Sequence, residues 1–182
     1  VGFEPSSLAV RPDAPLKDAR TLFESLRKGP KAYSVSIGST PGGTSHLVLG
    51  RAVRSLGIDP KQLKTVAFNG SAEAVTAVLG GHIDAMIAAI NNIVPHQQSG
   101  KMRALFVTSD SRLDEAFSEV PTLRESGDDV VDMGWTAIIA PPGLTPAQVT
   151  WWEATLAELT KTEEWRKYLA FNYWQNVFQG NA

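Results

Sequence analysis

The chain of 182 residues contains no cysteine. Disulfide bonds, thiol catalysis and cysteine-based zinc sites are therefore excluded, and both oxidising and reducing compartments stay compatible with the composition. The three histidines, His46, His82 and His96, lie far apart and form neither an HxH nor an HExxH pair. Because this spacing lacks the pattern of a metal site, we expect no bound metal.

A basic excess and a long apolar run are also missing. Lys and Arg number 17 against 19 Asp and Glu, which gives a formal net charge of -2, and the basic residues are dispersed. Nucleic-acid-binding domains normally carry a clustered basic excess, so we expect no nucleic-acid partner. No apolar run approaches the roughly 20 residues that span a bilayer, so we expect no direct membrane insertion. The first residues do not form a signal peptide, which indicates a mature, trimmed or truncated chain.

The sequence does contain a regular alternation of short apolar strands and amphipathic helices. The predicted strands lie at 7–11, 33–37, 63–68, 83–88 and 103–108, and the predicted helices between them at 18–28, 44–56, 71–79 and 90–99. Strands separated by single helices predict right-handed βαβ crossovers and a mainly parallel sheet. The expected fold class is therefore α/β.

Beyond Thr108 this alternation is lost. A polar passage with a short helix near 121–126 leads to an apolar stretch at 130–140. The tail is predicted to be helical, because Val149, Trp152, Leu156 and Leu159 recur at helical spacing. Thr162 is a candidate cap for a further helix at about 163–170, and a final strand is predicted at 174–178.

The segment 33–49, YSVSIGSTPGGTSHLVL, runs from a strand through a glycine- and hydroxyl-rich turn into a helix. The free N–H groups of a first helical turn, with Thr44 and Ser45 as candidate caps, favour an anion. Neither GxxxxGKS/T nor GxGxxG is present, so a carboxylate is favoured over a nucleotide. Such turns also occur in α/β domains that bind nothing at them, and that alternative stays open.

A second turn of this kind, Asn69-Gly70-Ser71, also joins a predicted strand to a helix. Both turns are expected at the carboxyl ends of strands, the edge where open α/β sheets bind ligands. His46 either donates to a bound carboxylate or caps the first turn. Asp84 is interpreted as a backbone-capping residue, because an unpaired buried acid is costly.

Motifs in one order and spacing link nearly the whole chain to a known family. They are SLAVRPDAPLKD at 7–18, IGSTPGGTSHL at 37–47, FNGSAEAVTAVLGGHIDAMIAAINNIVPHQQSGKMRALFVTS at 68–109, EVPTLRESG at 119–127 and GWTAIIAPPGLTP at 134–146. With these motifs the chain resembles the extracytoplasmic solute-binding proteins of tripartite tricarboxylate transporters, the TctC and Bug group.

The resemblance implies a type II periplasmic-binding-protein fold, in which two α/β lobes close on an organic acid. It implies one complete doubly wound lobe at 9–131, with 1–8 and 132–182 as the hinge and the C-terminal part of the second lobe. The apolar stretch at 130–140 is then the returning hinge strand. Family chains begin upstream of the point that matches Val1, so a preceding part and a signal peptide are expected. Trp135, Ile138 and the tail tryptophans are then expected to be exposed, or covered by another copy or a separate fragment.

In the family the two loops contact the ligand directly or through water. The resemblance thus implies a binding set of Ser39, Thr40, Gly43, Thr44, Ser45, His46, Asn69, Gly70 and Ser71. Ala88 and Ala89 stand where amino-acid-binding relatives carry an Asp-Asn pair, which favours a plain organic acid.

The implied function is periplasmic capture of a citrate-like tri- or dicarboxylate for the membrane components of the transporter, without a cofactor and without catalysis. A cytoplasmic effector-sensing domain uses the same bilobed fold, but a helix-turn-helix is absent from these residues. An acyl-transfer enzyme could use Ser39 or Ser45 with His46, yet no GxSxG elbow is present.

Overall fold

The computed structural model describes residues 2–38, 40–131 and 133–180. Ser39, one of the expected site residues, lies outside them. The chain divides into two compact units, a larger unit of Pro5–Met133 and a smaller unit that joins Val1–Glu4 to Gly134–Ala182. The expected lobe at 9–131 falls inside the larger unit. No helix among the described residues combines the length and apolarity needed to cross a membrane.

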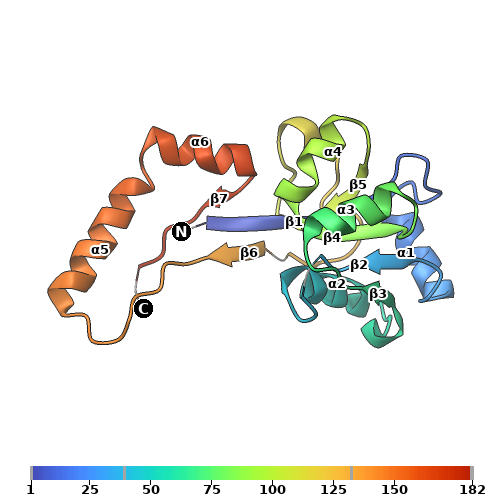
Figure 1. Ribbon diagram of the computed structural model, residues 1–182, viewed down its shortest axis with the longest axis horizontal. Helices are drawn as coiled ribbons and strands as arrows, with labels where there is room; N and C mark the ends of the chain where they lie inside the picture. Colours follow the sequence, from blue (N-terminus) through green and yellow to red (C-terminus); the bar gives the residue numbers. More distant parts are fainter. Residues whose placement is uncertain (1, 39, 132, 181–182) are drawn as a thin grey trace. The chain divides into compact units, whose positions relative to one another are not determined.

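A mixed sheet forms the centre of the larger unit (Figure 1). Its strands, in spatial order, are β3 (Lys64–Val66), β2 (Ser34–Ser36), β4 (Ala85–Ala89), β1 (Gly2–Val10) and β5 (Arg103–Val107). β2 pairs in parallel with both β3 and β4. β1 pairs antiparallel with both β4 and β5. Four strands therefore share one direction, and β1 opposes them.

The mainly parallel sheet is confirmed, but the first expected βαβ crossover is not formed, because β1 runs antiparallel to its neighbours. β1 and β2 are not neighbours, because β4 lies between them. The helix that connects β1 to β2 therefore does not return the chain to a parallel neighbour. A connection through one helix makes two strands parallel when the strands are neighbours in the sheet. The alternation of strands and helices in the sequence does not reveal which strands are neighbours.

Helices bury both faces of this sheet. One apolar cluster joins Leu8, Val10 and Ile87 of the strands to α1 (Ala19–Lys28) and α2 (Thr44–Ser55). The intervening strand residues Ala9, Met86 and Ala88 point to the other face and are also buried. α3 (Ser71–Leu79) contacts β4, and α4 (Val94–Gln98) contacts β5. The lobe is therefore doubly wound, as expected.

Polar side chains fix the starts of α1 and β2. Asp18 caps α1, since its carboxylate accepts the Thr21 N–H at 2.7 Å. Asp84 Oδ2 accepts the backbone N–H of Ser34 at 2.7 Å and its hydroxyl at 2.6 Å. Asp84 was expected to cap backbone close to it in the chain, and this is wrong in one respect: it does cap backbone, but at Ser34 in the neighbouring strand, 50 residues away.

Three expected elements differ from the structure. The helix expected at 90–99 is divided into a 3-10 turn, η2 (Ile90–Asn92), and the short α4, because Pro95 lacks an N–H and fits only the first turn of a helix. The helix expected near 121–126 is a series of turns, in which Glu125 accepts the Thr122 N–H at 2.8 Å. The apolar stretch at 130–140 contributes only the short strand β6 (Met133–Thr136).

The smaller unit contains α5 (Pro146–Leu159), α6 (Glu163–Asn172) and β7 (Gln175–Asn176). β7 pairs with Gly2 and Phe3 of β1, and β6 also pairs with β1. A capping box of Thr145 and Gln148 starts α5. Thr162 caps α6 as predicted, and its hydroxyl accepts the Trp165 N–H at 3.2 Å.

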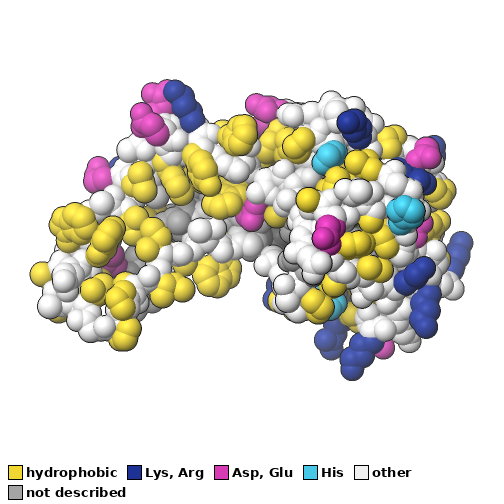
Figure 2. Space-filling model, in the orientation of Figure 1, with side chains coloured by type: hydrophobic (Ala, Val, Ile, Leu, Met, Phe, Trp, Pro, Cys, Tyr) yellow, Lys and Arg dark blue, Asp and Glu magenta, His cyan; other side chains and the backbone are white. Residues whose placement is uncertain are grey.

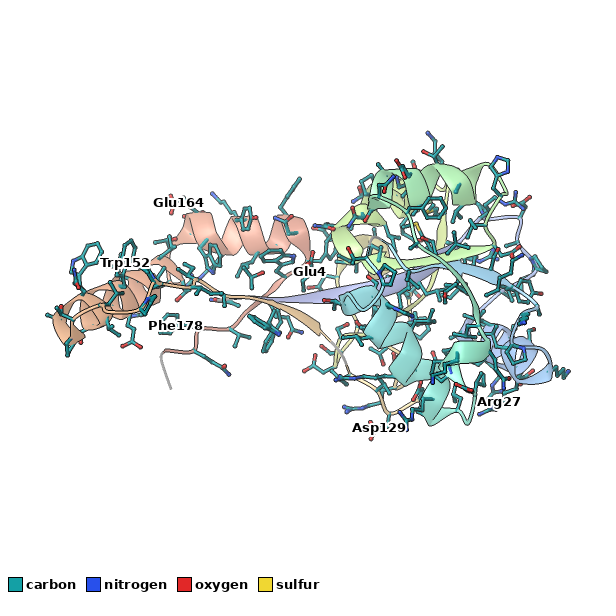
Figure 3. All side chains as sticks on the ribbon, turned by 60° about the horizontal axis from the view of Figure 1, so that its bottom comes forward. Glu4, Arg27, Asp129, Trp152, Glu164 and Phe178 are labelled. Carbon is teal, nitrogen blue, oxygen red and sulfur yellow. The ribbon has the colours of Figure 1, made fainter. Side chains whose placement is uncertain are left out.

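Large apolar side chains lie on the surface of the smaller unit (Figure 2). Trp135 is 71% exposed and Ile138 59%, while Trp151 and Trp152 are 59% and 49% exposed. These exposures agree with the expectation for Trp135, Ile138, Trp151 and Trp152. The other tail tryptophans, Trp165 and Trp174, are partly buried and do not meet it. A groove of about 810 Å³ is lined by residues that include Trp152 of α5 and Phe178 of the C-terminal segment (Figure 3).

Asp128 is a buried carboxyl group of the larger unit, only 2% exposed. Its Oδ1 accepts a hydrogen bond from the Ser55 hydroxyl at the end of α2. Its Oδ2 is buried and has no hydrogen-bond partner among the described residues. Burial raises the pKa of Asp128, and the Ser55 hydrogen bond offsets this only in part.

We expect this carboxyl to make stability fall with rising pH. The folded protein binds the proton more tightly than the unfolded chain, so stability is greatest below the unfolded pKa, falls toward the raised folded pKa and stays lower above it. As the pH rises from the unfolded pKa through the raised folded pKa of Asp128, Asp128→Asn should lose less stability than the natural protein. Urea denaturation at a series of pH values measures the free energy of unfolding of each protein. Asp114→Asn, at an exposed position, is the control. Equal slopes for both variants would show that Asp128 carries no such linkage.

Candidate ligand-binding site

The first turn of the expected site connects β2 to α2 through two glycines with positive φ, Gly38 at 76° and Gly42 at 87°. The Gly43 N–H donates to the Thr40 carbonyl at 2.9 Å and closes the turn. The nearest heavy atoms to a Cβ built on Gly38 are the Ile87 carbonyl oxygen and Ser45 Oγ, both 3.7 Å away. The turn therefore folds back between α2 and the end of β4.

The expectation that Thr44 or Ser45 caps α2 is wrong. The N-cap is Gly43, in an extended conformation with φ -69° and ψ 171°, and it has no side chain to offer the helix. The turn from Thr40 ends at Gly43, so Thr44 is already the first helical residue. The N–H groups of a first helical turn have no partner within the helix. At α2 no side-chain cap satisfies them.

His46 accepts a hydrogen bond within the first turn. Its Nδ1 lies 2.9 Å from the Gly42 nitrogen, which donates its N–H. Of the two alternatives for His46, capping the turn is therefore observed. An imidazole that accepts at Nδ1 carries its proton at Nε2, so this second nitrogen is a hydrogen-bond donor.

The second turn connects β3 to α3, which begins at Ser71 as predicted. Its N-cap is Gly70, again without a side-chain cap. Glu73, in the first turn of α3, accepts the Asn69 N–H at its Oε2 at 3.2 Å. Sequence analysis did not identify Glu73 as part of this turn, although its spacing from Gly70 is that of the acidic partner in a capping box.

Strand pairing brings these two turns to one edge of the sheet. Ser36, the last residue of β2, pairs in parallel with Val66, the last residue of β3. Neighbouring strands lie about 4.8 Å apart, so the turns that follow them leave the sheet side by side. β4 runs parallel to β2 on its other side and ends at Ala89. Three successive strand ends therefore meet at this edge.

The third strand end contributes amide side chains that sequence analysis also missed. Asn91 and Asn92 lie in η2, directly after β4. The Asn92 side-chain amide donates to Asn91 Oδ1 at 2.7 Å and lies 3.4 Å from the Ala89 carbonyl oxygen. Asn91 and Asn92 could have been found in the sequence, because they are polar residues directly after a buried strand of the predicted parallel sheet.

Comparison with known proteins decides the family. Residues 2–182 match the Tripartite tricarboxylate transporter family receptor, TctC. The chain belongs to this family. The TctC family consists of solute-binding receptors rather than enzymes, so the acyl-transfer alternative is not supported.

Curated relatives of this TctC chain include a UPF0065 protein of Bordetella bronchiseptica, which is 31% identical over 134 residues. Another is the protein BugT of Bordetella pertussis, 29% identical over 147 residues. These alignments cover 73% and 80% of this chain but only 38% and 44% of the relatives. The chain therefore spans less than half the length of these relatives.

Comparison with solved structures supports the same family assignment. A TctC solute-binding protein from Polaromonas matches 98% of this chain and 60% of its own, with a TM-score of 0.77 and 26% identity. MatC from Rhodopseudomonas palustris, solved with bound malate, matches 96% of this chain and 58% of its own, with a TM-score of 0.75 and 25% identity. The expected α/β periplasmic-binding-protein fold is confirmed.

The positive φ of Gly38 predicts a cost for any side chain there. Gly38→Ala should lower the free energy of unfolding by roughly 1 to 2 kcal/mol, because an L-residue is strained at this φ. Gly29→Ala is a matched control, since its φ is -157° and the nearest atom to its Cβ lies 3.8 Å away. Chemical denaturation of both variants measures the difference. An equal effect of the two substitutions would contradict a strained turn.

Proposed function

We propose that the complete protein containing this chain is a periplasmic solute-binding protein that captures an organic carboxylate for a tripartite tricarboxylate transporter. Its ligand is a di- or tricarboxylate, and its macromolecular partners are the membrane components of that transporter. The family match supports the receptor role. MatC, a relative with bound malate, supports a carboxylate as the ligand.

The assignment of the site is supported by the way in which the helices begin. Among the described helices of nine residues or more, α1, α5 and α6 begin with an Asp or Thr side chain that accepts a first-turn N–H. Only α2 and α3 begin at a glycine with no side-chain cap, and these are the two helices that follow the paired strands β2 and β3. A ligand carboxylate can take the place of the missing caps.

The proposed binding residues come from both turns. Backbone N–H groups provide most of the donors, and hydroxyl groups and the Nε2–H of His46 add to them. The full set is Ser39, Thr40, Gly43, Thr44, Ser45, His46, Asn69, Gly70 and Ser71. Ala88 and Ala89 provide no carboxylate for a ligand ammonium group, which favours a plain organic acid over an amino acid.

Carboxylates should stabilise the complete protein, whereas sugars and cationic amino acids should not. The proposed site offers only N–H and O–H donors, which match carboxylate oxygens. At about 100 times its dissociation constant, a ligand adds roughly 2.7 kcal/mol to the free energy of unfolding. A thermal-shift screen followed by calorimetry measures this. Tight binding of a sugar with all acids inert would contradict the proposal.

A side chain at either uncapped glycine should block the anion. Gly70→Val is the cleaner variant, because no atom lies within 4 Å of its Cβ and its φ of -170° suits a β-branched residue. Gly43→Val also brings its Cβ to 3.1 Å from the Thr40 carbonyl oxygen and should cost some stability. We expect malate affinity to fall at least about tenfold in both, since each variant loses charge-assisted hydrogen bonds.

Calorimetry and thermal melting of each variant separate binding from folding. Gly70→Val should melt close to the natural protein. If it binds malate normally, the second turn has a structural role only.

A further inference from the structure

Basic side chains that are dispersed along the sequence gather on one side of the larger unit. Residues 19–64 contain eight Lys and Arg against two acidic residues, Glu24 and Asp59, which gives this segment a net charge of +6 in a chain of net charge -2. Figure 2 shows Lys and Arg side chains around the lower right of the larger unit, where Figure 1 places α1, α2 and β3. Six exposed cations form what we call the basic cluster, and they are Arg27, Lys28, Lys31, Arg54, Lys61 and Lys64.

Contacts between neighbouring elements bring the basic cluster together. Arg27, in the last turn of α1, donates its Nε–H to the C-cap carbonyl oxygen of α2 at 3.3 Å, so the ends of the two helices lie side by side. The 3-10 turn η1 (Pro60–Gln62) also contacts α2. Lys64 starts β3 and pairs in register with Ser34, the first residue of β2, and Lys31 lies in the turn that leads into β2. The cluster therefore lies at the edge of the sheet where β2 and β3 begin.

The cluster keeps its positive charge in the folded protein. Among the described residues, none of the six cations forms an ion pair with an acidic side chain. Asp59 is close to the cluster, because it caps η1 by accepting the Lys61 backbone N–H at 3.0 Å, and Glu24 is exposed on α1. These two carboxylates cannot neutralise six cations.

A structural role explains only part of the cluster. Basic side chains in the last turn of a helix interact favourably with its dipole, which accounts for the three cations at the ends of α1 and α2. Lysine on an edge strand hinders pairing with another sheet, which accounts for Lys64 on β3. Neither reason applies to Lys31 or Lys61, and neither explains why six cations without ion pairs share one edge.

We propose that the basic cluster docks this protein on the surface of an anionic lipid bilayer. Clusters of about four to eight Lys and Arg are typical of segments that bind anionic headgroups electrostatically. Protein–protein interfaces, in contrast, are depleted in Lys and centred on buried aromatic or apolar side chains. Four of the six cluster members are Lys. Of the exposed large hydrophobic side chains, only Leu47 lies on an element of the cluster, and it is near the start of α2, away from Arg54.

The cluster lies at the opposite end of α2 from the proposed binding site. α2 has 12 residues, so its two ends are roughly 18 Å apart. β2 and β3 likewise begin at the cluster and end at the turns of the site. Docking through the cluster therefore leaves the site open. Lipid docking and carboxylate binding are separate properties, and each can be measured without the other.

Sedimentation of the complete protein with lipid vesicles tests the proposal. Vesicles of phosphatidylglycerol and phosphatidylcholine in equal amounts provide the anionic surface, and vesicles of phosphatidylcholine alone are the neutral reference. The natural protein should bind only the anionic vesicles. Each Lys or Arg near an anionic surface contributes about fivefold to the affinity. The triple variant Lys31→Gln, Lys61→Gln, Lys64→Gln should therefore bind these vesicles roughly a hundredfold more weakly.

The matched control removes three exposed positive charges from the smaller unit and leaves the cluster intact. Its substitutions are Lys161→Gln, Arg166→Gln and Lys167→Gln. The two triple variants have the same net charge, so a difference between them reports the cluster. The control should bind anionic vesicles as the natural protein does.

A salt titration tests the same point without a variant. Interactions between exposed charges are screened by salt, so high ionic strength should release the natural protein from the anionic vesicles. Malate calorimetry on both triple variants should give the affinity of the natural protein, and a failure to bind malate would contradict the proposed function alone.

Two results would overturn the docking proposal. One is a natural protein that does not bind the anionic vesicles, and the other is a cluster variant that binds them as well as the control. If the natural protein instead binds only neutral vesicles that contain the membrane components of the transporter, and the cluster variant does not, the partner is an acidic protein surface and the lipid assignment is wrong.

Discussion

The parallel pairing of β2 with β3 and β4 is the constraint on which the rest of the site depends. Parallel strands end at the same edge of a sheet, so the turns after β2 and β3 and the 3-10 turn after β4 become neighbours. Antiparallel pairing at either position would move one helix start to the opposite edge. β1 does oppose these strands, and α1, which follows it, begins away from the site with its own Asp18 cap.

The described helices of nine residues or more begin in two ways, either with a side-chain cap or with a glycine. Asp18, Thr145 and Thr162 each accept a first-turn N–H of α1, α5 and α6, which lie outside the proposed site. Gly43 and Gly70 leave the corresponding groups of α2 and α3 without a side-chain cap. Glycine is a tolerated N-cap, so each of these two starts costs only a few tenths of a kcal/mol relative to a Ser, Thr, Asn or Asp cap. In the proposed function a ligand carboxylate accepts the N–H groups that remain free there.

Local signals predicted the elements and not their pairing. The starts of α2 at Thr44 and α3 at Ser71, and the cap Thr162, follow from glycine and hydroxyl residues before an amphipathic run. Asp18, expected as the first residue of its helix, is instead the cap. The direction of β1 could not be predicted, because it depends on which strands lie beside it. Pro95 is visible in the sequence, yet its effect depends on where the helix starts. Glu73 was missed although it stands three residues after Gly70, because the capping-box pattern begins with Ser or Thr and the cap here is a glycine.

The central claim is that backbone N–H groups at the starts of α2 and α3 bind the carboxylate. Amide proton chemical shifts of the complete protein during a malate titration test it most directly, because each N–H reports its own hydrogen bond. The account predicts the largest downfield shifts at residues 44–46 and 70–72. Malate binding detected by calorimetry with no shift at these amides would contradict it.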